Sequence, residues 1–143
     1  MKIEMDQAAL NAFLEAEFPQ VAEDLRVDQV HAEGVDLRLM VKESHLRPGG
    51  TVSGPTMFGL ADVGIYLAIL SRIGPVALAV TTNASIDFMR KPEAGRDMIA
   101  RCRLLKLGRQ LAVADALLYS EGSDDAVARC SMTYAIPPGA ARR

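Results

Sequence analysis

Ser53 to Ser71 is the most uniformly apolar segment of the chain, and its flanks are typical of helix ends. A proline follows Ser53 and Gly54, and proline suits a first helical turn because its missing N–H would be unpaired there. Gly74-Pro75 then stops the pattern. A helix that is apolar on nearly every face must be surrounded by protein. We therefore expect this segment to be a buried central helix.

Two glycines interrupt this helix. Gly59 and Gly64 each weaken it by about 1 kcal/mol relative to alanine. Such a loss is understandable where something packs closely against the backbone, so we expect a close neighbour at both positions.

In the other segments apolar and polar residues alternate, as they do in half-buried strands. Val27 to Val41 alternates in part around a turn near Glu33 and Gly34, which predicts a hairpin. Four further strands are expected after the helix, at Ala77 to Met89, Asp97 to Leu107, Gln110 to Ser120 and Ala126 to Ile136. Their short connections predict an antiparallel meander that curves around the helix, or a helix covered in part by a second subunit.

The chain as a whole is expected to be one α+β domain, residues 1–143. Its length is common for a single domain, and half of its residues are hydrophobic, which is enough for a core. An amphipathic helix is expected at about residues 6–18, with Asp6 as N-cap and Pro19 after its end. The tail, about 137–143, is expected to fray.

Composition argues against several classes of protein. The 16 basic residues nearly balance the 18 acidic ones, so nothing favours nucleic acid or a membrane surface as partner. The N-terminal segment has no secretory pattern, which predicts a cytoplasmic protein. Cys102 and Cys130 lack metal-ligand spacing, so we expect reduced, buried thiols and no metal site. His31 and His45 fit no catalytic triad, although His45 could line a site.

Asp62 breaks the pattern of the central helix. It lies about two turns in, beyond the reach of capping or of the helix dipole. A buried carboxylate must have partners or face a solvated cleft. The residues alone leave two interpretations open: a functional carboxylate, or one that is paired with a neighbouring strand or across a subunit boundary.

Gly54 is the second candidate. A backbone N–H at a helix start can stabilise a developing oxyanion, although many helices begin with glycine for no such reason. The neighbouring glycine-rich loop lacks a phosphate-loop pattern, so no nucleotide site is expected.

The segment Arg47-Pro48-Gly49-Gly50-Thr51-Val52-Ser53-Gly54-Pro55, followed by Leu60-Ala61-Asp62, resembles a known family. That family is the hotdog-fold acyl-CoA thioesterases of the phenylacetate-pathway (PaaI-like) type, in which NxxGxxHGG precedes the helix and the aspartate follows the histidine by nine residues. The resemblance continues through TTNASIDFMRKPEAGRDMIARCRLLKLGRQ and covers about residues 34–136. It implies a hotdog fold with a curved antiparallel sheet wrapped around a long central helix.

The resemblance also implies residue roles. Asp62 matches the catalytic carboxylate, which acts as general base or as nucleophile, and the Gly54 N–H matches the donor that polarises the thioester carbonyl. Thr81 matches a hydroxyl that orients water, and Thr82 should point to the other side of the strand. Ser53 replaces the family's histidine. It can still form a hydrogen bond at the helix start.

Further residues are expected to bind substrate. Arg47 replaces the family's asparagine and would bring a fixed positive charge for a carboxylate or phosphate, whereas Pro55 suits the helix start. The substrate-binding candidates are Arg47, Gly50, Asn83, Arg90, Lys91 and Arg109. For the basic members, a solvated face is the alternative. The acyl pocket is expected among Phe58, Tyr66, Phe88 and Met89.

The expected function is hydrolysis of a small or medium acyl-CoA thioester by a homodimer or a dimer of dimers, with coenzyme A as part of the substrate and no other cofactor. The rival is a non-catalytic acyl-CoA-binding or regulatory module, since part of the motif is lost. A hotdog dehydratase is weaker, because that chemistry pairs the aspartate with a histidine.

Overall fold

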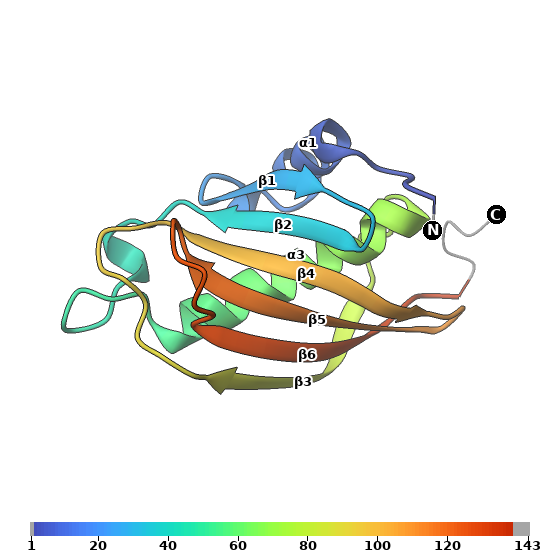
Figure 1. Cartoon of the computed structure of the whole chain (residues 1–143). Coiled ribbons are helices and arrows are strands. Elements are labelled where there is room, and N and C mark those ends of the chain that lie inside the picture. Colours follow the sequence, from blue (N-terminus) through green and yellow to red (C-terminus); the bar gives the residue numbers. More distant parts are fainter. Residues whose placement is uncertain (1, 139–143) are drawn as a thin grey trace.

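The computed structural model describes residues 2–138 and contains a six-stranded antiparallel sheet that curves around one long helix (Figure 1). The helices are α1 (Gln7–Glu17), α2 (Pro19–Ala22) and α3 (Gly54–Ile73), with a short 3-10 turn at Glu43–His45. The strands are β1 (Leu25–Val30), β2 (Gly34–Leu39), β3 (Val80–Phe88), β4 (Met98–Leu107), β5 (Leu111–Ser120) and β6 (Ala128–Ala135). The expected α+β hotdog architecture is confirmed. Most of the expected frayed tail lies outside the described residues.

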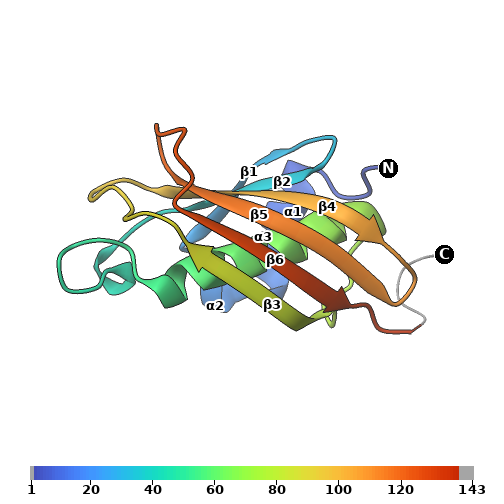
Figure 2. The same ribbon diagram turned by 60° about the horizontal axis from the view of Figure 1, so that its bottom comes forward.

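The order of the strands corrects one expectation. The sheet runs β1-β2-β4-β5-β6-β3, so β4, β5 and β6 form the expected meander but β3 does not precede them in it. Instead β3 pairs with β6 at the far edge, and β2 takes the place beside β4, with Leu37 opposite Ala100. The segment between β3 and β4 crosses the sheet (Figure 2). Sequence spacing predicts hairpins between neighbours along the chain, but it does not report such a crossing.

Helix α3 is the core element that the apolar pattern predicts. The Ser53 hydroxyl caps it by accepting from the Thr56 N–H, and Gly74 ends it with φ of 91°. It is 20 residues long and ends at Ile73, two residues beyond the expected end at Ser71. Length and composition alone would let it cross a membrane, but 78% of its most apolar window is buried inside the protein. It is therefore a core helix.

The two helix glycines have different surroundings. A Cβ on Gly64 would lie 2.6 Å from Sγ of Cys102 on β4, so the close packing expected there is present. A Cβ on Gly59 would meet no described atom within 4 Å. The space beside Gly59 is therefore open within one chain. Cys102 and Cys130 are free and buried, as expected.

The N-terminal helices cover the side of α3 near β1. Asp6 caps α1 by accepting from the Ala9 N–H at 2.9 Å, as the sequence predicts. Phe18 then interrupts the helix, and Pro19 begins α2. The resulting corner between α1 and α2 lies along α3 (Figure 2).

Strand β3 is the exposed edge of the sheet. None of its nine residues is buried, and among the described strands its ladder partner is β6 alone. A long edge strand exposes unpaired N–H and C=O groups, which is unfavourable unless another chain covers them.

Candidate active site

Asp62 is held by two hydroxyl groups from two strands. Oγ1 of Thr81 and Oη of Tyr134 each donate to Oδ1 of Asp62 at 2.6 Å. The Tyr134 hydroxyl also lies 3.0 Å from the Asp62 carbonyl oxygen. Among the described residues no donor reaches the other carboxylate oxygen, Oδ2. One oxygen is therefore fixed, and the other remains available.

The sheet register brings these hydroxyls together. Thr81 at the start of β3 is directly opposite Tyr134 at the end of β6, and both lie against α3. Burial, together with the Asp62 carboxylate, raises the pKa of Tyr134 far above its usual value. The phenol therefore keeps its proton and remains a donor. Thr82 binds the Thr133 carbonyl instead, so its side chain is not on Asp62.

A cavity of about 350 Å³ lies beside Asp62. Thr81 and Tyr134 line it together with Tyr66 of α3, and the corner between α1 and α2 closes one side. This volume is within the range of small-molecule sites. Of the four side chains expected to line an acyl pocket, Tyr66 is in this cavity, whereas the Phe88 ring packs 3.4 Å from the position of a Gly54 Cβ.

Ser53 and Gly54 lie at the start of α3. The Ser53 hydroxyl accepts from the Thr56 N–H at 3.3 Å and donates to Oγ1 of Thr56 at 2.9 Å, so it serves as a helix cap. Gly54 is the first helical residue, where an N–H has no partner within the helix. Asp62 is eight positions after Gly54, which is about 12 Å along the helix axis.

Most substrate-binding candidates lie at the helix-start end of the molecule. Arg47 and Gly50 are exposed in the loop before α3, and Gly50 has φ of 84°. Arg90 and Lys91 follow the end of β3, where Nε of Arg90 donates to the Ala126 carbonyl at 3.0 Å.

Two candidates lie elsewhere. Asn83 is exposed on β3, where it pairs with Thr133. Arg109 is in the turn between β4 and β5, at the opposite end of the molecule from the loop before α3 (Figure 1). The six substrate-binding candidates therefore do not lie together within one chain.

Neither histidine lies at Asp62. Nδ1 of His45 accepts from the Lys42 N–H at 3.0 Å, and Nε2 is 3.2 Å from Asp24, which fixes the short turn before α3. His31 is at the β1–β2 turn, with Nε2 3.1 Å from Asp36.

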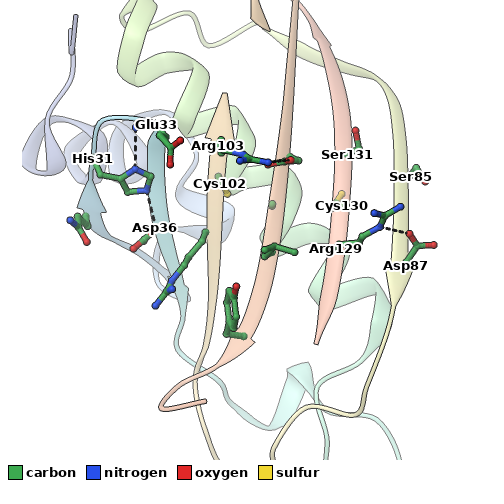
Figure 3. A pocket seen from close by; sticks show the side chains of 16 residues that line it. His31, Glu33, Asp36, Ser85, Asp87, Cys102, Arg103, Arg129, Cys130 and Ser131 are labelled. Carbon is green, nitrogen blue, oxygen red and sulfur yellow. Dashed lines mark hydrogen bonds and ion pairs between the residues drawn. The ribbon is translucent and has the colours of Figure 1, made fainter. Parts of the chain in front are cut away.

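A larger hollow of about 860 Å³ lies on the outer face of the sheet (Figure 3). Two ion pairs lie in it: Arg103 binds Asp115 at 2.8 Å, and Arg129 binds Asp87 at 2.8 Å. Cys130 also borders it, but its side chain is buried with those of Met132 and Tyr134, and burial together with the nearby Asp62 charge raises the pKa of its thiol to about 11. The Cys130 thiol is thus not activated, and Asp62 on the inner face remains the candidate functional group.

Tyr134 is the site residue that the sequence analysis missed. A signal was present: along β6, Cys130, Met132 and Tyr134 alternate with exposed or half-buried residues, which places a phenol on the inner face. A buried phenol needs a hydrogen-bond partner, and Asp62 was the carboxylate in need of one.

Comparison with known proteins agrees with this fold. Residues 49–127 match the Thioesterase superfamily. A "Putative esterase" of Pseudomonas aeruginosa is 32% identical over 99 residues, which cover 69% of this chain and 72% of that protein.

Solved structures extend the comparison. A "putative thioesterase" from Silicibacter sp. TM1040 is 56% identical, with a TM-score of 0.91 and 96% of each chain covered. A variant of the phenylacetic acid degradation protein PaaI from Thermus thermophilus is 28% identical, with a TM-score of 0.69, covering 88% of this chain and 99% of that one.

The curved sheet and the central helix define a hotdog fold, and Asp62 beside a cavity is its candidate site. The chain belongs to the Thioesterase superfamily, and its structural neighbours include PaaI-like thioesterases. Family membership supports thioester hydrolysis as the general activity.

Proposed function

We propose that the protein hydrolyses small or medium acyl-CoA thioesters to a free acid and coenzyme A. The observation that carries this proposal is the arrangement at Asp62, where Thr81 and Tyr134 hold one carboxylate oxygen and the other is available beside a cavity. We expect the reaction to run in the cytoplasm without a metal or a further cofactor.

The proposed chemistry uses Oδ2 of Asp62 in one of two ways. As a general base, it takes a proton from water while the water oxygen bonds to the thioester carbon. The C–S bond then breaks, and the coenzyme A thiolate takes up the proton. As a nucleophile, Oδ2 itself displaces the thiolate, and water hydrolyses the resulting anhydride. In both routes the carbonyl oxygen becomes an oxyanion that needs donors.

The oxyanion donor cannot come from the same helix. Gly54 and Asp62 are about 12 Å apart along α3, but both would have to lie within about 3 Å of atoms of one reacting group. We therefore propose that each active site is shared between two copies of the chain.

The exposed edge strand supplies a geometry for this sharing. Gly54 lies against Phe88 at one end of β3, and Asp62 is bonded to Thr81 at the other end. If two β3 strands pair antiparallel about Ala84, Phe88 lies opposite Val80 of the partner subunit. The Gly54 N–H of each subunit then approaches the Asp62 of the other.

This arrangement also explains the open space at Gly59. The two α3 helices would run antiparallel and approach each other most closely near residues 58 and 59, midway between Gly54 and Asp62. Gly59 has no side chain and no described neighbour within 4 Å of a Cβ position, so a second helix can approach there. Small residues permit such close helix contacts.

Coenzyme A carries phosphates, which require cations. Arg47, Arg90 and Lys91 are exposed at the helix-start end, near the Gly54 that would bind the carbonyl. We propose that they bind the phosphates, with Gly50 and Asn83 along the approach. Arg109 would contribute from the other end of the molecule, which an antiparallel partner brings to the same side.

A non-catalytic acyl-CoA-binding module is the second candidate. The observation that favours it is the helix-capping role of Ser53, which replaces the family's histidine and is already hydrogen-bonded to Thr56.

Two assays on the same protein separate the candidates. Thiol release is measured over acyl-CoAs of increasing chain length, and binding of the same compounds is measured by calorimetry. The hydrolase hypothesis expects thiol release above the spontaneous rate for at least one of them. Binding without any release would support the module and contradict the hydrolase.

A further inference from the structure

The cavity beside Asp62 has a wall that belongs to neither the sheet nor the central helix. Glu17, Phe18 and Gln20, from the corner between α1 and α2, form part of that wall. Ala77 and Ala79, from the segment between α3 and β3, form another part of the wall. The cavity is therefore lined both by the carboxylate and by the N-terminal helices.

Aromatic rings form much of this wall. Tyr66 packs edge-on against Phe18 with centroids 6.3 Å apart, and it stacks on Tyr134 at 6.1 Å. Both phenols are occupied, since Tyr66 donates to the Ala77 carbonyl at 2.9 Å and Tyr134 donates to Asp62. The tyrosines therefore present ring surface to a ligand, and their hydroxyl hydrogens are already bound.

The charges that line the cavity are all negative. They are those of the half-buried Asp62 and the exposed Glu17, and among the described lining residues there is no lysine or arginine. Burial, and then the charge of Glu17, raises the pKa of Tyr66 in the cavity wall. An acyl group that ends in a carboxylate would be repelled by both Asp62 and Glu17.

We propose that the acyl group of the thioester occupies this cavity, and that Glu17 and Asp62 restrict it to uncharged acyl groups, excluding those that end in a carboxylate. The proposal rests on the proposed function for the reaction, but it assigns the acyl site and its charge selectivity separately. Phe18 and Ala79 set the length of the acyl group that fits. The Phe18 ring forms part of the wall, and the small Ala79 leaves room that a larger side chain would fill.

Charge selectivity is tested with hexanoyl-CoA and glutaryl-CoA, which are similar in length and differ in a terminal carboxylate. The parent should prefer hexanoyl-CoA in kcat/KM. Glu17→Gln should reduce that preference about threefold to tenfold, and added salt should reduce it in the parent, because the repulsion is electrostatic. Glu15→Gln, an exposed position of α1 outside the cavity, should leave it unchanged.

Length selectivity is tested with two variants of opposite effect. Ala79→Leu should lower the ratio of hexanoyl-CoA to acetyl-CoA turnover, and Phe18→Ala should raise the relative turnover of decanoyl-CoA. For each protein the turnover of two acyl-CoAs is measured on the same preparation, and only their ratio is compared with that of the parent. A smaller fraction of folded protein lowers both rates equally and leaves the ratio unchanged.

Binding separates the failure of this inference from that of the proposed function. Calorimetry on Asp62→Asn, with hexanoyl-CoA and glutaryl-CoA, reports the acyl site without turnover and measures the charge selectivity due to Glu17, the carboxylate that remains in the described lining. The charge selectivity is overturned if the two compounds bind with equal affinity and Glu17→Gln changes neither affinity. The length selectivity is overturned if Ala79→Leu and Phe18→Ala both leave the chain-length profile of turnover unaltered. Either result counts against the inference even if the parent hydrolyses thioesters. Selective binding without turnover would support the acyl site and overturn the hydrolase.

Discussion

Tyr134 donates its hydroxyl hydrogen to Oδ1 of Asp62 at 2.6 Å, from a position 72 residues further along the chain. Thr81 donates to the same oxygen at the same distance. Two donors on one oxygen restrict rotation of the carboxylate and leave Oδ2 on the side of the cavity. The pair therefore defines both the orientation of Asp62 and the oxygen that reacts.

Tyr134→Phe should lower kcat about tenfold while changing KM less than twofold. The variant keeps the ring packing against Tyr66 and removes one hydrogen bond to a charged group, a contact of about 1.5–3 kcal/mol. Steady-state kinetics with the best acyl-CoA measure the effect. Tyr119→Phe, on the outer face beneath Arg101, is the matched control and should keep parental kcat. Equal kcat for both variants would show that Tyr134 does not position Asp62.

Thr81→Val should likewise lower kcat, because valine keeps the shape and removes the donor at 2.6 Å. The neighbouring Thr82→Val removes a hydroxyl that binds only the exposed Thr133 carbonyl, so it should change kcat by less than twofold. The double variant Thr81→Val/Tyr134→Phe should lose more than either single one, because Oδ1 then has no described donor. Additive losses would indicate independent donors, and a larger combined loss would indicate that each partly substitutes for the other.

Local signals explain how much of this site could be predicted. The start of α3 depends on neighbours in sequence, so Ser53, Gly54 and the following proline were sufficient to predict it. Asp62 also stood out locally, as a carboxylate in an apolar helix. The nine-residue spacing to Ser53 then related it to a family.

Non-local features could not be read in the same way. The pairing of β3 with β6 joins Thr81 to Tyr134 across more than fifty residues, and no turn signal reports it. The expected meander was therefore wrong at β3, and the Tyr134 hydrogen bond was missed. The cavity has the same origin, since its wall at Phe18 comes from the far N-terminal part of the chain.

Gly59→Leu should weaken self-association and activity without unfolding the protomer. A leucine there meets no described atom of its own chain within 4 Å of its Cβ position and is a better helix former than glycine. Sedimentation velocity and circular dichroism measure the two effects. Gly64→Ala is the contrast, because its Cβ would meet Sγ of Cys102 at 2.6 Å and should lower Tm. An unchanged, fully active oligomer of Gly59→Leu would contradict the proposed contact between α3 helices.

The two thiols should be unreactive in the folded protein. Burial raises the pKa of Cys102 well above its usual value, and burial together with Asp62 raises that of Cys130 to about 11. Because the thiolate is the reactive form, the native protein at pH 8 should resist iodoacetamide, and unfolded protein should be alkylated at both positions. Stability should also fall as pH rises from about 9 toward 11, since the unfolded thiols ionise first. Rapid alkylation of native protein by mass spectrometry would contradict this burial.

The central claim is that the Asp62 carboxylate performs the hydrolysis, and Asp62→Asn tests it most directly. Asparagine keeps an oxygen that can accept from Thr81 and Tyr134, but it can neither take a proton from water nor attack the thioester. The measurement is thiol release from the best acyl-CoA by parent and variant, with matched melting temperatures as the check on folding. We predict that kcat falls by about a hundredfold or more in the variant. A variant that cleaves as fast as the parent would contradict the account.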